Sequence, residues 1–157
     1  RPIREGETDG VEYFFTSSEK LEQFKNSGKI VELRTYETVM GPWSYFTMDD
    51  GQFDIHGEGD CLMIGTLESY EKMCRYYGNG ALVPVYIEVP DGIRLLRAVK
   101  REGKQKNPNY REVCRRYLAD EDDFSEELLS RLRIGKRFSN TDLEACLEEI
   151  LKEMESH

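Results

Sequence analysis

Residues 61–89 read CLMIGTLESYEKMCRYYGNGALVPVYIEV, and this stretch indicates the fold class more strongly than any other part of the chain. Its two ends, 61–65 and 81–89, are continuous apolar runs of the kind found in strands that are buried on both faces. Between them Thr66 can cap a helix that stops before Gly78. A strand, a helix and a strand in this order predict a parallel pair and therefore an α/β core.

The same alternation continues toward the C-terminus. Pro90 or Asp91 is expected to open a helix whose apolar residues Ile93, Leu96 and Val99 face inward. The remaining elements are two helices that start at Asn107-Pro108 and at Ser125, a short strand over 135–138, and a last helix opened by the capping box Thr141-Asp-Leu-Glu144.

The part that precedes residue 61 is small and rich in strand signals. Residues 11–16 follow the turn dipeptide Asp9-Gly10 and favour a strand, and a helix from Ser17 or Ser18 to Gly28 comes next. A second strand is expected over 29–33. Residues 43–47 and 52–55 flank Asp50-Gly51 and predict a hairpin.

Composition restricts the class of function. The chain has 157 residues and a net charge of −9, which suits one domain and argues against binding duplex nucleic acid or an anionic membrane. No apolar run reaches the roughly 18 residues of a membrane-spanning helix, and the N-terminus does not resemble a signal peptide, so a cytoplasmic protein is expected. The four cysteines are scattered singly, which predicts small core residues of a reduced compartment and neither a zinc site nor a catalytic Cys/His pair.

Basic residues concentrate in one segment. Residues 94–116 hold nine basic and two acidic residues, so the net charge of this segment is +7. Because the whole chain has a net charge of −9, the remaining residues together carry −16. An acidic stretch, 120–127, follows directly. A solvated helical hairpin with complementary charges is one interpretation of this pattern, and a binding site for an anionic ligand is the other.

The first fifteen residues resemble a known motif. The run Arg1-Pro-Ile-Arg4-Glu-Gly-Glu7-Thr-Asp9-Gly10-Val-Glu-Tyr13-Phe-Phe15 is similar to the GMP-binding segment of guanylate kinases. Glu32 stands where that family has a strand glutamate, and Asn140-Thr-Asp142-Leu143 resembles the family's Asn-Asp-Asp-Leu. The resemblance implies a P-loop NTPase-type parallel sheet core with helices on both faces, a small mostly β subdomain that binds the nucleoside monophosphate, and a helical lid.

The resemblance also implies a division of the single domain 1–157. Residues 1–58 would form the GMP-binding subdomain, 59–96 with 126–157 the α/β core, and 97–125 the lid. The implied activity is transfer of the γ-phosphoryl group of ATP to GMP, with Mg²⁺ bound to ATP.

Each candidate site residue takes its role from the matching position in the family. Arginine and tyrosine side chains supply charge-assisted donors to a phosphate, and a carboxylate accepts from the N1–H and the amine of guanine. The lid arginines would neutralise the phosphates during transfer. The candidates are therefore Arg1, Arg4 and Tyr13 for the GMP phosphate, Glu32 for guanine, Ser44 for GMP, Arg97, Arg101 and Arg116 for catalysis, and Asn140 for adenine.

Three features depart from the family. The family's tyrosine-glycine-serine segment after the glutamate reads Met40-Gly41-Pro42-Trp43-Ser44-Tyr45 here, where the Ser44 and Tyr45 side chains could serve. The chain contains no GxxxxGK[ST] loop, so we expect that about thirty to forty residues carrying a strand and this loop precede Arg1 in the complete protein. The core strand lacks both aspartates of the family, because it reads Leu62-Met63-Ile64-Gly65-Thr66-Leu67-Glu68.

These departures keep a second hypothesis open, in which the chain is a catalytically inactive module that binds a phosphorylated peptide or a nucleotide. In either case the 157 residues alone are expected to show no ATP turnover. The sequence predicts no oligomeric state.

Overall fold

The computed structural model describes residues 1–3, 6–38, 41–51, 57, 61–78 and 80–155. They form a mixed α/β structure with two compact units, each described here by itself. The first unit comprises Arg1–Ile64 with Glu71–Ala81, and the second comprises Gly65–Tyr70 with Leu82–His157. None of the helices in the described ranges combines the length and the apolar character that crossing a membrane requires.

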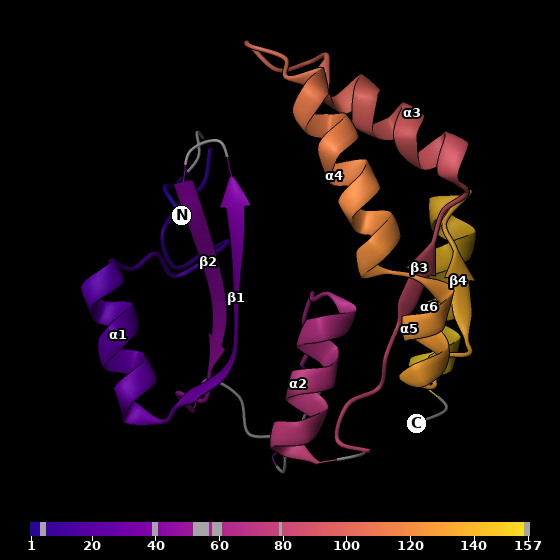
Figure 1. The fold of residues 1–157 in the computed structure, drawn as a ribbon. Helices are drawn as coiled ribbons and strands as arrows, with labels where there is room; N and C mark the ends of the chain where they lie inside the picture. Colours follow the sequence, from indigo (N-terminus) through magenta and orange to yellow (C-terminus); the bar gives the residue numbers. More distant parts are fainter. Residues whose placement is uncertain (4–5, 39–40, 52–56, 58–60, 79, 156–157) are drawn as a thin grey trace. The chain divides into compact units, whose positions relative to one another are not determined.

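The first unit is built on an antiparallel β-hairpin (Figure 1). Helix α1 (Ser18–Ser27) precedes it; the Ser17 side chain caps its start, and Gly28 ends it in the left-handed conformation at φ 69°. Strands β1 (Ile30–Thr38) and β2 (Gly41–Met48) then pair along their length. The helix predicted from Ser17 or Ser18 to Gly28 is thus confirmed.

Helix α2 (Leu67–Tyr77) spans the boundary between the two units. In the first unit the Lys72 ammonium donates to the carbonyl oxygen of Leu33 at 3.0 Å, and the Tyr76 hydroxyl donates to the Asp49 carboxylate at 2.9 Å. Leu67, near the other end of the helix, lies in the core of the second unit. The predicted cap at Thr66 is confirmed, because its hydroxyl accepts from the Ser69 amide at 3.4 Å.

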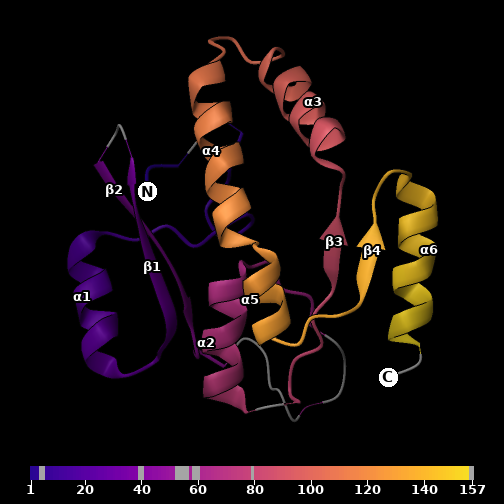
Figure 2. The same ribbon diagram turned by 45° about the vertical axis from the view of Figure 1, so that its right-hand side comes forward.

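The second unit holds a two-stranded parallel sheet and most of the helices (Figure 2). Strand β3 (Tyr86–Glu88) pairs with β4 (Arg137–Ser139), so the prediction of parallel strands is confirmed for this pair. The helices are α3 (Asp91–Glu102), α4 (Tyr110–Asp123), α5 (Glu126–Arg131) and α6 (Leu143–Met154). Leu67, Leu129 and Ile134 form the buried core, against which Tyr70, Tyr86, Phe124, Leu128 and Leu132 pack.

Two predicted strands are absent. Residues 11–16 form a turn followed by extended chain, with an isolated bridge between Asp9 and Tyr13. Two hydrogen bonds hold this conformation: the Asp9 carboxylate accepts from the Phe15 amide at 2.7 Å, and the Gly10 amide donates to the Tyr13 carbonyl oxygen. Residues 61–65 form no strand either, and Leu62 and Ile64 lie exposed. A strand needs a pairing partner, and none of the described residues pairs with this segment.

Other predicted boundaries are wrong by smaller amounts. The strand expected over 81–89 is reduced to β3, whereas the strand expected over 29–33 extends to Thr38. Residues 43–47 do lie in a hairpin, but their partner is β1. The predicted partner, residues 52–55, lies outside the described residues.

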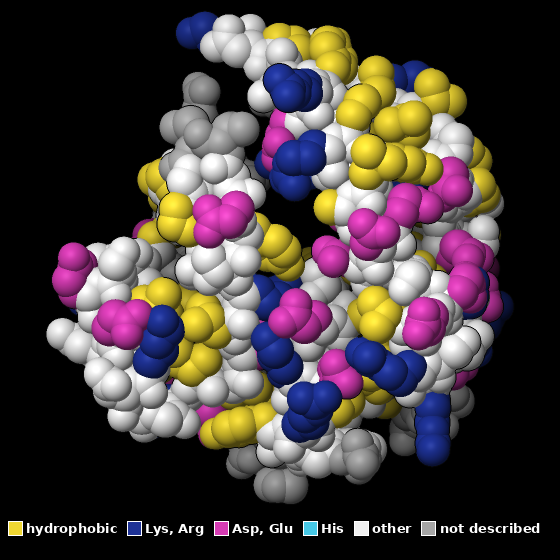
Figure 3. All heavy atoms as spheres, in the orientation of Figure 1, with side chains coloured by type: hydrophobic (Ala, Val, Ile, Leu, Met, Phe, Trp, Pro, Cys, Tyr) yellow, Lys and Arg dark blue, Asp and Glu magenta, His cyan; other side chains and the backbone are white. Residues whose placement is uncertain are grey.

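Several side chains predicted to face the core are exposed. Helix α3 carries Ile93, Leu96 and Val99 on its surface, and hydrophobic side chains gather over this helix in Figure 3. The cysteines divide: Cys146 is buried and Cys74 is half-buried, but Cys61 and Cys114 are exposed. The expectation that all four belong to the core is therefore wrong for the last two.

Candidate ligand-binding face

Strand alternation places a set of polar and aromatic side chains on one face of the β1–β2 hairpin. In the antiparallel register Glu32 lies opposite Thr47, Arg34 opposite Tyr45, and Tyr36 opposite Trp43. Directly opposite residues share a face, and so do residues two apart on one strand. We call this set the hairpin face; its members are Glu32, Arg34, Tyr36, Trp43, Tyr45 and Thr47.

The carboxylate of Glu32 is buried on this face, since the residue is only 3% exposed. The Arg34 Nε donates to its Oε2 at 2.9 Å, and Arg34 Nη2 donates to its Oε1 at 3.3 Å. The Thr47 hydroxyl donates to Oε1 at 3.1 Å. Burial alone would lower the pKa of Arg34, but the hydrogen bond and the charge of Glu32 outweigh it, so this pKa is raised. Arg34 therefore keeps its charge next to the Glu32 carboxylate.

Arg1 lies beside Tyr45 of the same face. Its side chain is 4% exposed and binds Glu7 through two hydrogen bonds, of 2.8 and 2.6 Å. The guanidinium lies 4.9, 5.3 and 5.8 Å from the ring centroids of Tyr13, Phe15 and Tyr45. The hydrogen bond with Glu7 is the main cause that raises the pKa of Arg1. Arg1 is thus a fixed cation enclosed by aromatic rings.

Aromatic contacts connect the surroundings of Arg1 with the hairpin face. The Tyr45 ring lies 6.0 Å from that of Tyr13 and 6.1 Å from that of Tyr36, in edge arrangements. Tyr45 also lies opposite Arg34 across the hairpin. The buried Nε of Arg1 has no hydrogen-bond partner among the described residues and so retains one donor toward them. A cation, a carboxylate and aromatic rings side by side can bind an anionic group and a planar group that offers hydrogen-bond donors.

Ser44 does not belong to this face. It lies opposite Thr35, whose hydroxyl is 2.8 Å from that of Ser44, and both residues alternate with Glu32 and Arg34. Strand alternation therefore places Ser44 on the opposite face of the hairpin from Glu32, and its role in binding GMP stays a prediction. Arg4, the other predicted phosphate ligand, lies outside the described residues.

Two predicted residues of the second unit contact each other. The Arg97 side chain on α3 donates to the Asn140 carbonyl at 2.8 Å, to Asn140 Oδ1 at 3.3 Å and to the Thr141 carbonyl at 3.2 Å. Asn140 follows β4, and its amide donates to the Glu88 carbonyl at 2.9 Å. Arg97 thus ties α3 to the segment between β4 and α6.

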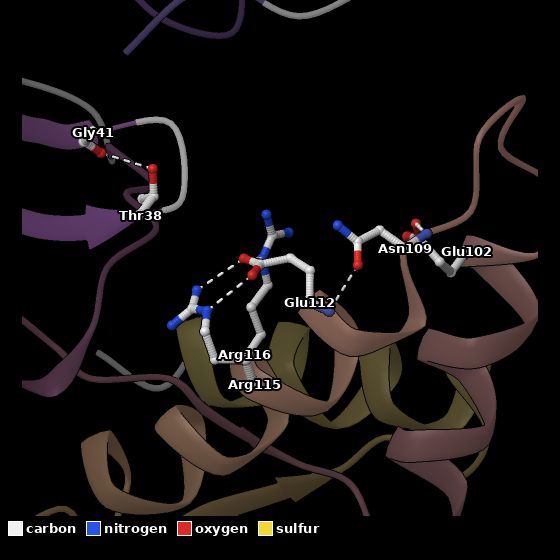
Figure 4. Close-up of polar contacts among 7 residues, drawn as sticks. All are labelled: Thr38, Gly41, Glu102, Asn109, Glu112, Arg115 and Arg116. Atoms are coloured by element: carbon white, nitrogen blue, oxygen red, sulfur yellow. Dashed lines mark hydrogen bonds and ion pairs between the residues drawn. The ribbon is translucent and has the colours of Figure 1, made fainter.

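The other two predicted lid arginines, Arg101 and Arg116, differ in their surroundings, and Figure 4 shows those of Arg116. Arg116 Nε donates to Glu112 at 2.9 Å, and Arg115 binds the same carboxylate at 2.8 and 2.9 Å. These bonds, led by that from Arg115, lower the pKa of Glu112 to about 2. Arg101 is exposed in the last turn of α3.

The helical hairpin of α3 and α4 is held near its base by Arg94. Its guanidinium pairs with Glu121 of α4, lies 4.4 Å from the centroid of Tyr117, and reaches Asp91 at 3.4 Å. At the opposite end, the Asn109 side chain caps α4 by accepting from the Glu112 amide, and the Glu102 carboxylate accepts from the Asn109 amide at 2.6 Å (Figure 4). The segment 97–125, predicted as a lid, thus contains the second half of α3 and all of α4, which pack against each other.

Comparison with known proteins leaves the family of this chain open. No model of a known protein family matches the sequence, and no curated protein matches it. Within the described residues, no three His, Cys, Asp or Glu side chains converge as a metal site.

Proposed function

We propose that this chain is part of a nucleoside monophosphate kinase of guanylate kinase type, which transfers the γ-phosphoryl group of ATP to GMP. One observation carries the proposal: the hairpin face continues without a break from the carboxylate of Glu32 through Arg34 and Tyr45 to the enclosed cation Arg1. A nucleoside monophosphate would use both groups, because its phosphate is an anion that a cation binds and its base carries hydrogen-bond donors that a carboxylate binds.

The phosphate would bind at the Arg1 end. Arg1 offers its unpaired Nε–H, and the nearby tyrosines Tyr13 and Tyr45 bring hydroxyl groups. Hydrogen bonds from a charged donor to a phosphate are about twice as strong as neutral ones. Glu7 keeps the guanidinium in place as the ligand enters, since it binds the other two nitrogens.

The base would bind at the Glu32 end. A carboxylate accepts from both the N1–H and the exocyclic amine of guanine, whereas adenine presents an acceptor at N1. Adenine would gain neither of these hydrogen bonds, and a hydrogen bond to a charged group contributes about 1.5–3 kcal/mol. Glu32 would therefore select guanine.

The ATP half of the site belongs to the second unit in this proposal. Arg97, Arg101 and Arg116 would stabilise charge on the transferring group, and Asn140 would lie near adenine. The GxxxxGK[ST] loop would come with a further strand. Two findings agree with an added strand: β3 pairs only with β4 among the described residues, and Val85 and Ile87 are exposed although parallel strands are normally covered on both faces.

Mg²⁺ enters this proposal only as the partner of ATP. The described residues supply no carboxylate cluster for it, so we assign none of them to the ion. We also propose a cytoplasmic location, which agrees with four cysteines that are all free.

A catalytically inactive binding module is the second candidate. It is favoured by the bonds that two of the three predicted catalytic arginines already make, Arg97 with Asn140 and Arg116 with Glu112. A kinase must release these arginines to reach phosphates, whereas a module that binds a phosphorylated peptide or a nucleotide at Arg1 need not.

A coupled assay of the complete protein separates the two candidates. ADP production with GMP as acceptor, and less with AMP or dGMP, supports the kinase. If none of these nucleotides supports ADP production while GMP still binds, the inactive module is correct.

The role of Glu32 is tested by Glu32→Gln in the 157-residue chain. The amide offers one acceptor and no charge, so GMP affinity should fall at least tenfold, which is about 1.4 kcal/mol, and the preference over AMP should shrink. Glu37→Gln is the matched control, because it makes the same change on the opposite face of β1. Equal GMP affinity in the Glu32 variant and the wild type would contradict base reading by Glu32.

A further inference from the structure

Arg34 occupies the acceptors that a guanine base would need. Its Nε and Nη2 donate to the two different oxygens of Glu32, at 2.9 and 3.3 Å. With Thr47 on Oε1 as well, three donors already bind this carboxylate, and its side chain is 2% exposed. A second pair of parallel donors cannot approach the same edge of the carboxylate while Arg34 remains in place.

The donors of Arg34 and of guanine are chemically equivalent. A guanidinium presents two N–H groups side by side in one plane, and it pairs with both oxygens of a carboxylate. The N1–H and the exocyclic amine of guanine form the same planar two-donor edge. We infer that Arg34 holds the place of the guanine edge in the empty protein and is a specificity-determining residue that GMP must displace, an inference that rests on the proposed function.

The position of Arg34 on the strand makes the exchange local. It is two residues from Glu32 and shares the hairpin face, and its Nη1 lies 3.5 Å from the Tyr36 hydroxyl. Release of Glu32 therefore needs a change of side-chain rotamer and leaves the strand pairing intact. The guanidinium then faces the same ligand, next to Tyr36 and Tyr45.

The exchange has opposite consequences for the two purines. When GMP binds, the guanine edge donates two hydrogen bonds to Glu32 in place of the two from Arg34. Because the Arg34–Glu32 ion pair is lost in this exchange, the net affinity for GMP is lower than it would be without Arg34. AMP offers no two-donor edge at N1, so in its complex Arg34 stays on Glu32 and nothing is lost. Arg34 therefore narrows the difference in affinity between GMP and AMP, and it keeps the buried carboxylate paired when the site is empty.

Titration of the 157-residue chain with GMP and with AMP tests this inference, with Arg34→Met as the variant and the fluorescence of Trp43 or calorimetry as the signal. We expect GMP to bind the variant about tenfold more tightly and AMP affinity to be unchanged or lower, so that the ratio of the two affinities rises. Arg75→Met is the control, because it removes an exposed arginine paired with Glu71 at 2.8 Å in the same unit; it should change neither affinity.

Arg34→Lys keeps the proposal testable if the methionine variant does not fold. Lysine retains the charge but donates from a single nitrogen, so its GMP affinity should lie between those of the wild type and the methionine variant. Weaker or unchanged GMP binding in these variants would overturn the inference while leaving the GMP site intact. Failure of GMP to bind the wild type and every variant would overturn the proposed function together with it.

Discussion

A single carboxylate, Glu112, is bound by two arginines in the first turns of α4. Arg115 and Arg116 reach it at 2.8 and 2.9 Å, and its pKa falls from the ordinary 4.5 to about 2. A folded-state pKa below the unfolded value means that the ionised group stabilises the folded protein at any pH above about 4.5. That stabilisation is lost as the pH falls from about 4.5 to about 2.

The titration of Glu112 can be followed by NMR of its side-chain carboxyl carbon. We expect a midpoint below the ordinary value of 4.5, and Glu112→Gln should remove the corresponding loss of stability in acid. The stabilisation should amount to less than about 1 kcal/mol, because both arginines are half exposed and water screens the pairs. A midpoint close to 4.5 would show that the arginines do not hold the carboxylate in solution.

The bond between Arg116 and Glu112 also affects the proposed role of Arg116 in binding phosphates. Arg116 was expected to serve phosphates, and in the protein without ligands Glu112 neutralises part of its charge. A nucleotide that binds Arg116 must compete with this carboxylate. In the complete protein Glu112→Gln should therefore tighten ATP binding severalfold, as long as Arg116 is a phosphate ligand; an unchanged ATP affinity in this variant would remove Arg116 from the site.

At the scale of elements, α6 begins one residue later than the capping box suggests. The sequence predicts Thr141 as the cap, but the Asp142 carboxylate accepts from the Ala145 amide at 3.0 Å. The backbone carbonyl oxygen of Thr141 instead accepts a hydrogen bond from the Arg97 side chain. Aspartate is a better cap here for a second reason, since its charge favours the positive end of the helix dipole.

Paired alanine substitutions distinguish the two caps. Asp142→Ala should lower the free energy of unfolding by about 1 kcal/mol, whereas Thr141→Ala should change it by less than about half of that. Urea denaturation followed by far-UV circular dichroism measures both. The reverse order would show that Thr141 caps the helix in solution.

Helices follow the sequence more closely than strands do, for a physical reason. A helix start such as Ser17 with Lys20 is set by a bond within four residues, so local sequence is sufficient. The start predicted at Asn107-Pro108 lies two residues too early, because the cap of α4 is Asn109. A strand needs a partner elsewhere in the chain. The apolar segment 61–65 has the composition of a buried strand, yet without a partner it stays unpaired. At residues 11–16 a local competitor, the Asp9 side chain, takes a backbone amide that a strand would have used.

In the candidate site, too, some residues can be found from a local motif and others only from the pairing of the strands. Arg1, Tyr13 and Glu32 are found from a motif, and the structure places them on one continuous face. Arg34 and Thr47 join them only through the register of β1 with β2, which the sequence does not reveal because it predicts a different hairpin partner. Once β1 is known to reach Thr38, the spacing of two between Glu32 and Arg34 places both on one face.

For the whole molecule, the division into two units predicts that they respond separately to core mutations. Leu129 is 1% exposed in the core of the second unit, and Leu129→Ala should cost about 2–5 kcal/mol there. Trp43, the single tryptophan, lies in β2 of the first unit. We therefore expect the variant to lower the midpoint of the helical transition, seen by circular dichroism, and to leave the midpoint of the Trp43 fluorescence transition unchanged.

Leu118→Ala is the matched control for this experiment. It makes the same change in the second unit at a position that is 65% exposed, so both transitions should stay near those of the wild type. If Leu129→Ala moved the two transitions together, the units would unfold as one cooperative body.

The two exposed cysteines have a practical consequence. Cys61 belongs to the first unit and Cys114 to the second, while Cys146 is buried and Cys74 is half-buried. Thiol reagents should therefore modify Cys61 and Cys114 first, and replacement of Cys74 by serine would leave one accessible thiol in each unit. The protein thus carries its own pair of attachment points for spin labels or fluorophores, and the distance between them can be followed as GMP is added.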